Sequence, residues 1–560
     1  EITTRLVGSE MCIRDRILTG RKLGFATLRQ YGGMSGFPKT QEDPADAFNT
    51  GHSSTSISAG LGMAQARELT GDNYYVVSVI GDGALTGGMA YEAMNNASRM
   101  KTNFIIVLND NQMSISENVG GMNQYLNSFR TSDAYLDLKD GVTNSLNRIP
   151  VVGERMVKRI RNAKSGIKQL FVPGMFFENM GITYLGPVDG TNIKEIRKVL
   201  AEAKRVRGPV LVHVRTIKGE GYLPAERHPA RFHGTGPFDI DTGVPLYHQE
   251  KAHYTDVFST VMRKMGEREP KVVAITAAMA DGTGLKRFKN LFPERFFDVG
   301  IAEEHAVTFA AGMAKAGLKP VFAVYSSFLQ RAYDQVLHDV CAQNLAVVFA
   351  VDRAGLVGKD GATHQGIFDL SYLSSIPNLT VMAPKNKWEL SDMLKYAIAA
   401  EEPVAIRYPR GEACDLWKDQ RAPIQKGCAE VLAEGTEVAL FAIGSMVETA
   451  WQVRKKLAEK GIPTTVVNAR FAMPLDKNCL RKLAESHPLL VTMEENVASG
   501  GFGEHVAAFL EEEALHTKVL RIAIPDCFVE HGSVGELKKA LGLDADSVTE
   551  KILAELPEEL

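Results

Sequence analysis

Short, uninterrupted apolar runs recur along the chain, and each ends in a polar turn. Unalternated runs of Val, Ile and Leu are typical of strands that are buried on both faces of a sheet. Such strands are predicted at residues 74–80, 103–108, 209–214, 272–275, 320–325, 346–351, 438–443, 464–468 and 489–493. Helical patterns lie between them, for example at residues 89–100, 193–205, 302–316 and 446–460. This alternation predicts βαβ units, and therefore α/β domains built on mainly parallel sheets.

Two polar, turn-rich stretches, at residues 238–253 and 411–427, interrupt the alternation. They divide the chain into three predicted domains, at residues 1–250, 251–418 and 419–560. Between residues 114 and 181 the sequence has Gly/Asn-rich stretches and a helical pattern at 151–170, but no clear strand. We expect this segment to be an excursion from the first domain. The third domain shows no polar cluster, which favours a structural role for it.

Composition excludes several classes of protein. The 560 residues are 45% hydrophobic and 23% charged, which is ordinary for globular domains and unlike disordered, collagenous or coiled-coil chains. The 64 Lys and Arg residues against 67 Asp and Glu residues leave a net charge of −3, which gives no indication of a nucleic-acid or membrane partner. No apolar run approaches the ~18 residues that a membrane helix needs. The 6 cysteines are scattered without a CxxC pair, which predicts a reducing, cytoplasmic compartment.

The first strand–helix–strand unit brings polar side chains to one edge of the predicted sheet. Its first strand ends in Gly81-Asp82-Gly83-Ala84, and its second strand ends just before Asn111. Parallel sheets bind ligands at the carboxyl ends of their strands, so Asp82 and Asn111 are expected side by side. A carboxylate and an amide oxygen suit Mg²⁺, which often takes further ligands from phosphate and water. The glycines would let a diphosphate approach the backbone. The alternative is a tight turn without a ligand.

Two predicted helix starts contain further candidate site residues. Gly51-His52-Ser53 is predicted to open a helix rich in hydroxyl residues, and such a start offers amides and hydroxyls to an anion. A capped helix with a surface histidine explains the same residues equally well. Glu303 follows a short predicted strand at 296–299 and opens an apolar helix. Because a glutamate there commonly compensates the helix dipole, the local pattern by itself favours a structural role.

Several polar residues of the second domain have no evident use in packing. Tyr325 ends one predicted strand and Arg353 follows another, whereas Asp360, His364 and Arg410 lie on loops that contain glycine or proline. A single exposed arginine is usually solvated. Several charged groups at strand ends, beside glycines, instead predict a site for a small anionic molecule.

Together these motifs resemble the 1-deoxy-D-xylulose-5-phosphate synthase family, which is related to transketolase. The resemblance is carried by long runs, which include ILTGR (17–21), GHSSTSISAG (51–60), VIGDGALTGGM (79–89), LNDNQMSISENVG (108–120), GPVDG (186–190), DVGIAEEHAVTFAAGMA (298–314), FLQRAYDQVLHDV (328–340), DRAGLVGKDGATHQGIFDLSYL (352–373) and RYPRG (407–411). It implies a homodimeric transferase, dependent on thiamine diphosphate and Mg²⁺, with no nucleic-acid or membrane partner. The implied reaction condenses pyruvate with D-glyceraldehyde 3-phosphate, releases CO₂ and gives 1-deoxy-D-xylulose 5-phosphate. The product would feed isoprenoid, thiamine and pyridoxal phosphate synthesis.

The resemblance also implies the domain roles and the site. The first domain would hold the diphosphate and Mg²⁺, the second the aminopyrimidine of the cofactor, and the third would be the C-terminal transketolase-like domain. The metal ligands would be Asp82, Asn111 and the Met113 carbonyl. The residues implied to contact the cofactor are Gly51, His52, Ser53, Gly83, Ala84, Asn111, Tyr222 and Glu303.

Catalytic and substrate-binding roles follow from the same resemblance. Glu303 would hydrogen-bond the N1′ atom of the aminopyrimidine and so help the cofactor to lose its thiazolium proton. The implied substrate-binding residues are Tyr325, Arg353, Asp360, His364 and Arg410, of which the two arginines would hold the phosphate of the acceptor. Glu303, His52, His233 and His364 are the implied catalytic residues, since imidazole titrates near neutral pH and can carry protons. Arg331 is a further candidate, although an ion pair explains it equally well.

Two alternatives stay open at the level of sequence. A transketolase would share the cofactor but use a ketose phosphate donor, and the long run at 352–373 argues against it. The other alternative is an inactive, incomplete chain, because the resemblance is dense from Ile17 onward and is not evident in residues 1–16. We expect these sixteen residues to be a foreign or shortened N-terminal segment, which would leave the chain poorly soluble and at most weakly active.

Overall fold

The computed structural model describes residues 4–7, 16–113, 118–128, 175–246 and 250–557. In this part of the chain there are two compact units, one within Glu1–Met11 and Pro38–Tyr247 and the other within Cys12–Phe37 and His248–Leu560. The first unit holds one sheet and the second unit holds two. The helix predicted at 151–170 lies outside the described residues.

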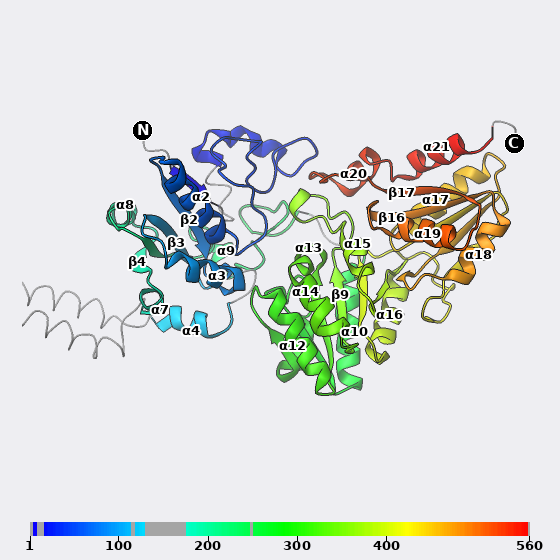
Figure 1. Ribbon diagram of the computed structural model, residues 1–560, viewed down its shortest axis with the longest axis horizontal. Helices are drawn as coiled ribbons and strands as arrows, with labels where there is room; N and C mark the ends of the chain where they lie inside the picture. Colours follow the sequence, from blue (N-terminus) through cyan, green and yellow to red (C-terminus); the bar gives the residue numbers. More distant parts are fainter. Residues whose placement is uncertain (1–3, 8–15, 114–117, 129–174, 247–249, 558–560) are drawn as a thin grey trace, which may run out of the picture. The chain divides into compact units, whose positions relative to one another are not determined.

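The sheet of the first unit is entirely parallel, with the strand order β1-β2-β3-β5-β4 (Figure 1). Its strands are β1 (Thr4–Val7), β2 (Tyr75–Gly81), β3 (Phe104–Asp110), β4 (Thr183–Asp189) and β5 (Pro209–Arg215). Helices α2 (Ser56–Thr70) and α3 (Gly88–Ala97) pack on one face, and α8 (Ile193–Ala203) packs on the other. Successive residues of β3, such as Ile105 and Ile106, enter the cores on opposite faces, which explains the unalternated apolar run.

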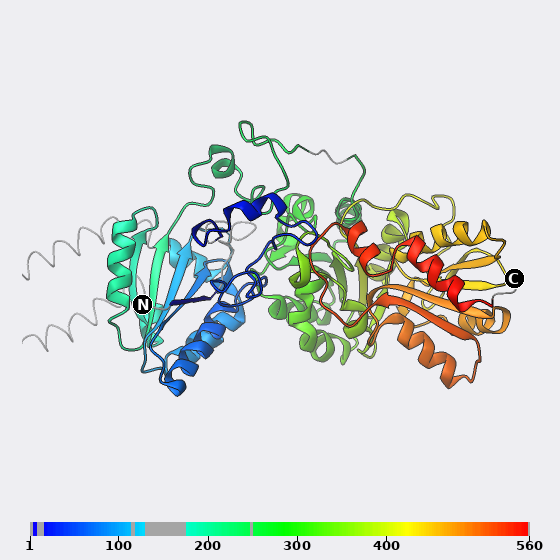
Figure 2. The ribbon, with the colours of Figure 1, turned by 90° about the horizontal axis from the view of Figure 1, so that it is seen from above.

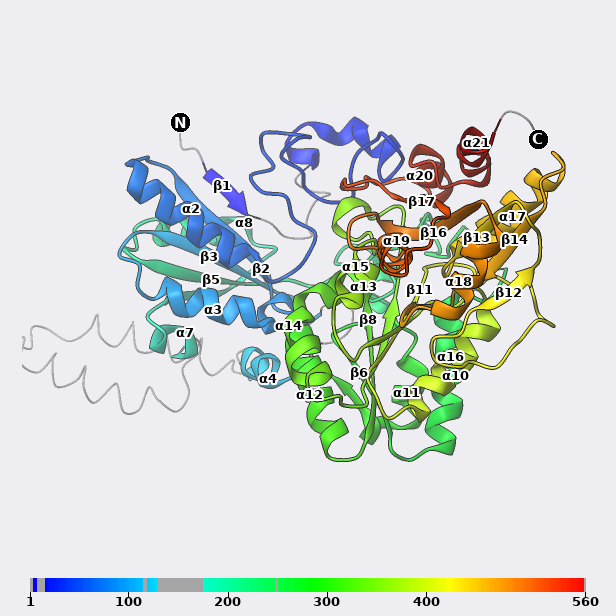
Figure 3. The same ribbon diagram turned by 45° about the vertical axis from the view of Figure 1, so that its right-hand side comes forward.

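The second sheet has the order β15-β10-β11-β9-β8-β6-β7 and is parallel except at β15. Its strands are β6 (Val272–Thr276), β7 (Phe296–Asp298), β8 (Lys319–Tyr325), β9 (Val348–Asp352), β10 (Thr380–Met382), β11 (Val404–Tyr408) and β15 (Phe471–Met473). Helices α10 (Tyr254–Arg268) and α16 (Lys387–Ala399) cover one face, and α12 (Glu303–Lys315) covers the other (Figure 3). Because β15 comes from the last third of the chain, this sheet ties two parts of the second unit together.

The third sheet has the order β12-β14-β13-β16-β17, and its one antiparallel pair is β12 with β14. Its strands are β12 (Glu430–Ala433), β13 (Val438–Ala442), β14 (Thr464–Asn468), β16 (Leu489–Val497) and β17 (Lys518–Ile524). In Figure 2 the red helix α21 (Ala545–Glu555) lies on one side of this sheet and the orange helix α19 (Phe502–Glu512) lies on the other.

Further α-helices lie among the described residues. They are α4 (Gly121–Ser128), α7 (Met175–Asn179), α9 (Leu223–Arg227), α11 (Lys286–Leu291), α13 (Ser326–Leu329), α14 (Tyr333–Gln335), α15 (Asp369–Ser374), α17 (Met446–Ala458), α18 (Lys477–Ser486) and α20 (Val534–Ala540). Among the residues that the structure places, no helix has the length and apolar character needed to cross a bilayer.

The predicted α/β class with mainly parallel sheets is confirmed. Several of the strands that the sequence pattern missed are incompletely buried or have a broken apolar run. Strand β17 lies at a sheet edge and is largely accessible, and β4 is only half-buried. Strand β11 is fully buried but contains Arg407, whose charge is neutralised by the buried Asp369 carboxylate at 2.9 Å.

Candidate active site

The first cluster lies at the carboxyl ends of β2 and β3. Gly81 pairs with Asn109 in the parallel register, so Asp82 and the turn after β3 emerge side by side. The Asp82 carboxylate is buried and accepts hydrogen bonds from the backbone N–H groups of Gly83, at 3.0 Å, and Gln112, at 2.6 Å. The Asn111 side-chain oxygen accepts a bond from the Met113 N–H at 3.0 Å. The predicted metal ligands are therefore brought together at one sheet edge.

A second carboxylate, Asp110, is buried in the same place. Burial raises the pKa of Asp82, the neighbouring Asp110 raises it further, and the Gln112 and Gly83 amides partly oppose this. Asp110 is held by His213, whose Nε2 atom lies 3.0 Å from the carboxylate, and Tyr184 hydrogen-bonds the other ring nitrogen at 2.7 Å. Sequence reasoning did not single out these three residues, because a buried histidine has no local sequence signature.

These surroundings fit a divalent cation. Two adjacent buried carboxylates repel each other, and a cation at this edge would relieve the repulsion. The described residues contain no group of three or more His, Cys, Asp or Glu side chains that could hold a metal unaided. The donors present are one carboxylate, one amide oxygen and one backbone carbonyl. That set suits Mg²⁺, which keeps several positions for phosphate oxygens and water.

The Gly51–Ser53 segment lies beside this edge. Helix α2 begins at Ser56, later than predicted, so Gly51, His52 and Ser53 lie in the turn before it. Ser54 has a positive φ of 73° and donates a hydrogen bond to the Ala84 carbonyl at 2.7 Å, which ties this turn to the Gly83–Ala84 turn. A Cβ atom added to Gly81 would meet no atom of the described residues within 4 Å. The space at this edge is therefore open to a ligand.

Tyr222 and His233 lie in another part of the first unit, between residues 216 and 246. The Tyr222 hydroxyl donates to the Ile240 carbonyl at 2.8 Å, and its ring packs edge-on against Phe232. His233 Nδ1 lies 2.9 Å from the Lys218 ammonium. A role for Tyr222 at the cofactor would require its hydroxyl to exchange this internal hydrogen bond.

Glu303 is the first residue of α12, as predicted, but it is not a surface residue that compensates the helix dipole. Its relative exposure is only 2%. Among the described residues, its Oε2 atom has no hydrogen-bond partner, although the Arg331 guanidinium lies 3.6 Å away. Burial raises the pKa of Glu303, and Arg331 opposes that shift. A buried carboxyl group with a free oxygen and a raised pKa fits a nitrogen base of a ligand, such as the N1′ atom of an aminopyrimidine.

The second cluster, in the second unit, contains all five predicted substrate-binding residues. Asp360 lies between two arginines: its Oδ2 atom is 2.9 Å from Arg410, and its Oδ1 atom pairs with Arg29. Burial raises the pKa of Asp360, but Arg410, Arg29 and then His364 oppose it, and the net effect is a lowered pKa. Asp360 is therefore an anion held among cations.

The remaining members of this cluster stack on aromatic rings. The Arg353 guanidinium lies 3.7 Å from the centre of the Tyr325 ring, and burial raises the pKa of Tyr325 to about 12. His364 is sandwiched between Phe37, stacked at 4.8 Å, and Phe328, edge-on at 5.5 Å. These contacts give a cluster of cationic groups beside an aromatic wall.

Arg29 and Phe37 are site residues that sequence reasoning missed. Both lie in the segment before residue 38, far in sequence from Asp360 and His364, and yet they belong to the same compact unit as these residues. Arg29 has a positive φ of 62°, which is uncommon for a residue other than glycine. A single arginine or phenylalanine in a Gly-rich loop carries no local signal for such a role.

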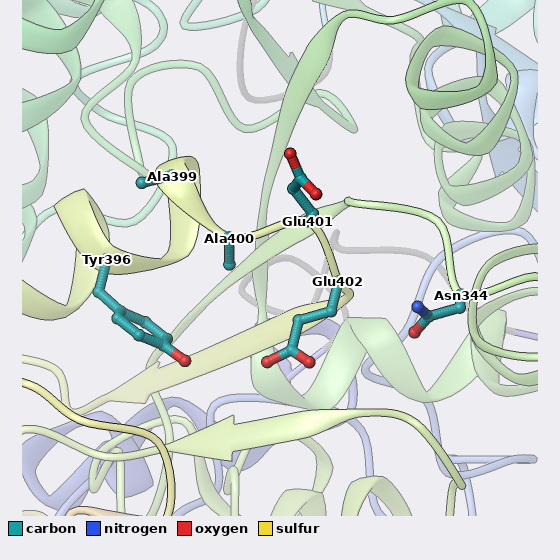
Figure 4. Close-up of a pocket in the computed structure, with 6 residues that line it drawn as sticks. All are labelled: Asn344, Tyr396, Ala399, Ala400, Glu401 and Glu402. Atoms are coloured by element: carbon teal, nitrogen blue, oxygen red, sulfur yellow. The ribbon is translucent and has the colours of Figure 1, made fainter.

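A pocket of about 390 Å³ lies in the second unit, where α16 ends and the chain enters β11 (Figure 4). Its lining residues are Asn344, Tyr396, Ala399, Ala400, Glu401 and Glu402. The Glu402 carboxylate accepts hydrogen bonds from the Thr380 hydroxyl, at 3.0 Å, and from the Lys426 ammonium, at 2.5 Å. None of the predicted site residues lines this pocket.

Three family models match successive parts of the chain. Residues 9–216 match the model described as 1-deoxy-D-xylulose-5-phosphate synthase, residues 250–414 match the transketolase pyrimidine binding domain, and residues 427–548 match the transketolase C-terminal domain. A solved structure described as a split gene transketolase, inactive β4 tetramer, is 30% identical with a TM-score of 0.50, and the match covers 54% of this chain and 98% of that chain. Fold and site together define a transketolase-like α/β enzyme, a transferase of aldehyde or ketone groups.

Relatives with similar sequences narrow this class. The 1-deoxy-D-xylulose-5-phosphate synthase of Lachnoclostridium phytofermentans is 57% identical over 538 residues, which are 96% of this chain and 86% of that relative. The synthase of Clostridium tetani is 52% identical over 97% of this chain and 87% of its own length. The chain belongs to the 1-deoxy-D-xylulose-5-phosphate synthase family. The family match begins at residue 9, earlier than the Ile17 at which we expected the resemblance to start.

Proposed function

We propose that this protein condenses pyruvate with D-glyceraldehyde 3-phosphate, with loss of CO₂, to give 1-deoxy-D-xylulose 5-phosphate. The family membership carries this proposal, because the similarity to synthases of that name extends over 96% of the chain. It favours the synthase over both alternatives, a transketolase and an inactive chain. The product would enter isoprenoid, thiamine and pyridoxal phosphate synthesis.

The transketolase-like family implies thiamine diphosphate, and we propose Mg²⁺ as its partner. Asp82, Asn111 and the Met113 carbonyl would hold the metal, and Gly51, His52, Ser53, Gly83 and Ala84 would surround the diphosphate. The support for this is the open edge beside Gly81 and the two buried carboxylates that a cation would separate. When bound, the cofactor supplies the carbon nucleophile for the keto group of pyruvate and accepts the electron pair that loss of CO₂ leaves behind.

Glu303 would hold a proton for the aminopyrimidine. Its raised pKa keeps the carboxyl group able to donate a proton to, or share a proton with, the N1′ atom. Arg331, 3.6 Å away, limits that rise, so the group can still give up its proton. Burial excludes water from this exchange, and its geometry is fixed by the first turn of α12.

The second cluster would bind the aldehyde acceptor. Arg353 and Arg410 would take its phosphate, because guanidinium groups form paired hydrogen bonds to phosphate oxygens. Tyr325, Asp360 and His364 would line the reacting end, and His52, His233 and His364 are the proposed proton carriers. The support for this is the packing of Arg353 on Tyr325 and of His364 between two aromatic rings.

The three-domain division, the homodimer and the cytoplasmic location remain predictions. The five cysteines of the described residues are all unpaired, which is consistent with a reducing compartment.

One assay separates the proposed reaction from its main alternative. The purified chain is incubated with thiamine diphosphate, Mg²⁺, pyruvate and D-glyceraldehyde 3-phosphate, and CO₂ and the ketose product are measured. We expect CO₂ and 1-deoxy-D-xylulose 5-phosphate in equal amounts. Ketol transfer from a ketose phosphate, without CO₂ release from pyruvate, would instead show a transketolase, and no turnover of either kind would show an inactive chain.

A further inference from the structure

The loop at residues 353–366 carries three proposed substrate-binding residues, and its shape is set at its base. Gly355 and Gly366 exchange two backbone hydrogen bonds, at 2.6 and 2.8 Å. Inside the loop, the buried Gln365 side-chain oxygen accepts a bond from the Val357 N–H at 2.7 Å. The loop therefore has a defined form, but these bonds alone do not fix where its outer part, around Asp360, lies.

The third sheet supports the base of this loop. Glu495, near the end of β16, accepts the Leu356 N–H at 2.9 Å with one carboxylate oxygen and the Ser445 hydroxyl at 2.5 Å with the other. A Cβ atom added to Gly355 would lie 2.9 Å from the Glu495 carboxyl carbon. The loop therefore packs directly against β16, with no room for a larger residue between them.

The outer part of the loop rests on a second segment of the same domain, residues 530–532. The Gln365 amide donates to the Glu530 carbonyl at 3.1 Å. A Cβ atom on Gly358 would lie 2.9 Å from the Gly532 carbonyl oxygen, and one on Gly361 would lie 3.2 Å from the Cβ of His531. His531 is only 4% exposed, so its ring is enclosed by this packing.

His531 also contacts the opposite side of the acceptor site. Its Nε2 atom lies 3.0 Å from the Gly33 carbonyl oxygen and must donate, since a carbonyl can only accept. Gly33 belongs to a turn that is closed by a hydrogen bond from the Arg29 N–H to the Met34 carbonyl at 2.7 Å. Arg29 is the residue that pairs with Asp360 across the site. His531 therefore touches both loops whose side chains form the Arg29–Asp360 pair.

We propose that His531 is a positioning residue for the phosphorylated aldehyde: its ring fixes the distance between the two loops, and so keeps the cations around Asp360 in register for the phosphate. The proposal rests on the proposed function, because its readout is the use of that aldehyde. It gives the C-terminal domain a part in substrate binding, beyond the structural role that its sequence indicated.

The test compares His531→Leu, which removes the donor, with His531→Gln, whose amide nitrogen can occupy the place of Nε2. We expect His531→Leu to raise the KM for D-glyceraldehyde 3-phosphate about tenfold, the value of one lost hydrogen bond, with kcat and the KM for pyruvate within about twofold of wild type. His531→Gln should restore the wild-type KM. Ser533→Ala, which removes the hydroxyl that bonds Glu536 at the start of α20 two residues away, is the matched control and should leave both KM values unchanged.

The results separate this inference from the proposed function. A wild-type chain that makes no 1-deoxy-D-xylulose 5-phosphate would overturn the function itself. With an active wild type, an unchanged KM in His531→Leu, an equal rise in both KM values, or a His531→Gln variant as impaired as the leucine variant would overturn the role of His531. If His531→Leu does not fold, as judged by circular dichroism, His531→Asn is measured under the same criteria, because its side chain is too short to reach the Gly33 carbonyl.

Discussion

At the scale of single residues, burial distinguishes the functional interpretation from the structural one. Glu303 has the sequence position of a common helix-dipole glutamate, and its enclosure is what sets it apart. Arg353 likewise follows a strand in the manner of many surface arginines, but its guanidinium lies 3.7 Å from the centre of the Tyr325 ring. Both residues have a specific environment that a solvated side chain lacks, and both can be tested by a single substitution.

Glu303→Gln should slow the exchange of the thiazolium proton for deuterium by at least about a hundredfold, because the amide cannot share a proton with N1′. Cofactor affinity should change little. The exchange is followed by NMR on the loaded enzyme, with Glu304→Gln, the less buried neighbour, as the control. An exchange rate in Glu303→Gln equal to that of the control would show that the carboxyl group serves only the helix.

Arg353→Ala should weaken the use of D-glyceraldehyde 3-phosphate by about 2–5 kcal/mol in kcat/KM, the usual loss when one partner of a desolvated charge pair is removed. Arg410→Ala should weaken it by less, because the Arg410 side chain is 43% exposed. The use of unphosphorylated glyceraldehyde should fall far less. Lys359→Ala removes an exposed charge from the same loop and should affect the two aldehydes equally. If the arginine variants also lose activity equally on both aldehydes, these residues do not bind the phosphate.

At the scale of elements, strand ends and helix starts place the charges. The carboxyl ends of β2 and β3 bring Asp82 and Asn111 together, because neighbouring parallel strands end at one edge. In the third sheet, the first turn of α19 holds a carboxylate of the neighbouring strand β16. The buried Glu494 carboxylate accepts the N–H groups of Phe502 and Gly503, each at 2.8 Å.

Asp82→Ala should abolish the Mg²⁺-dependent binding of thiamine diphosphate, since the metal would lose its carboxylate ligand. The fold should persist, because the repulsion with Asp110 is relieved while two buried amides lose their acceptor, effects of about 1–3 kcal/mol each. Calorimetry measures the affinity. Asp189→Ala, which removes an exposed carboxylate at the end of β4 in the same sheet, should bind as wild type. Unchanged affinity in Asp82→Ala would reject the metal assignment.

The titration of Glu494 should make stability fall as the pH rises. Burial raises the pKa of Glu494 to about 7, against an ordinary 4.5 in the unfolded chain, and the two amides oppose this only in part. The folded state therefore binds the proton more tightly. The contribution of this proton to the free energy of unfolding is complete below pH 4.5. It is lost between pH 4.5 and about 7, and the loss is roughly 2–4 kcal/mol.

Glu494→Gln should remove this part of the pH dependence, because the amide does not titrate. Urea unfolding at several pH values measures the difference between variant and wild type. Glu504→Gln, at an exposed position on α19, should keep the wild-type slope. A wild-type slope in Glu494→Gln would show that the carboxyl group titrates normally.

At the scale of the whole molecule, buried charges join the second and third sheets. Glu389 of α16 pairs with Arg470 at 2.8 Å, and Arg470 in turn pairs with Glu430 of β12 at 3.1 Å. Lys385 pairs with Glu430 as well. Lys385, Glu389 and Arg470 are buried, and Glu430 is partly buried. Together with β15, which joins the second sheet from the last third of the chain, this network makes the two sheets one unit.

Glu389→Gln should lower the free energy of unfolding of this unit by about 3–5 kcal/mol, because two buried cations would then face one carboxylate. Urea unfolding followed by tryptophan fluorescence measures the loss. Glu513→Gln breaks the exposed pair with Arg481 and should cost less than about 1 kcal/mol. Equal losses in the two variants would mean that the buried network adds nothing to stability.

The sequence by itself determined the α/β class, most of the central strands and the Asp82–Asn111 pair, because these depend on local apolar runs and on the ends of neighbouring strands. Its resemblance to a family also predicted five substrate-binding residues. The structure brings these residues into one cluster, and their role remains a prediction. Only the tertiary structure decided the rest. Arg29 pairs with Asp360 across 331 residues, and His531 reaches Gly33 across 498. Contacts of that separation leave no periodic or local pattern, since they depend on how distant loops pack together. Burial, which supports the proposed role of Glu303, is likewise a property of the folded chain and not of the residue.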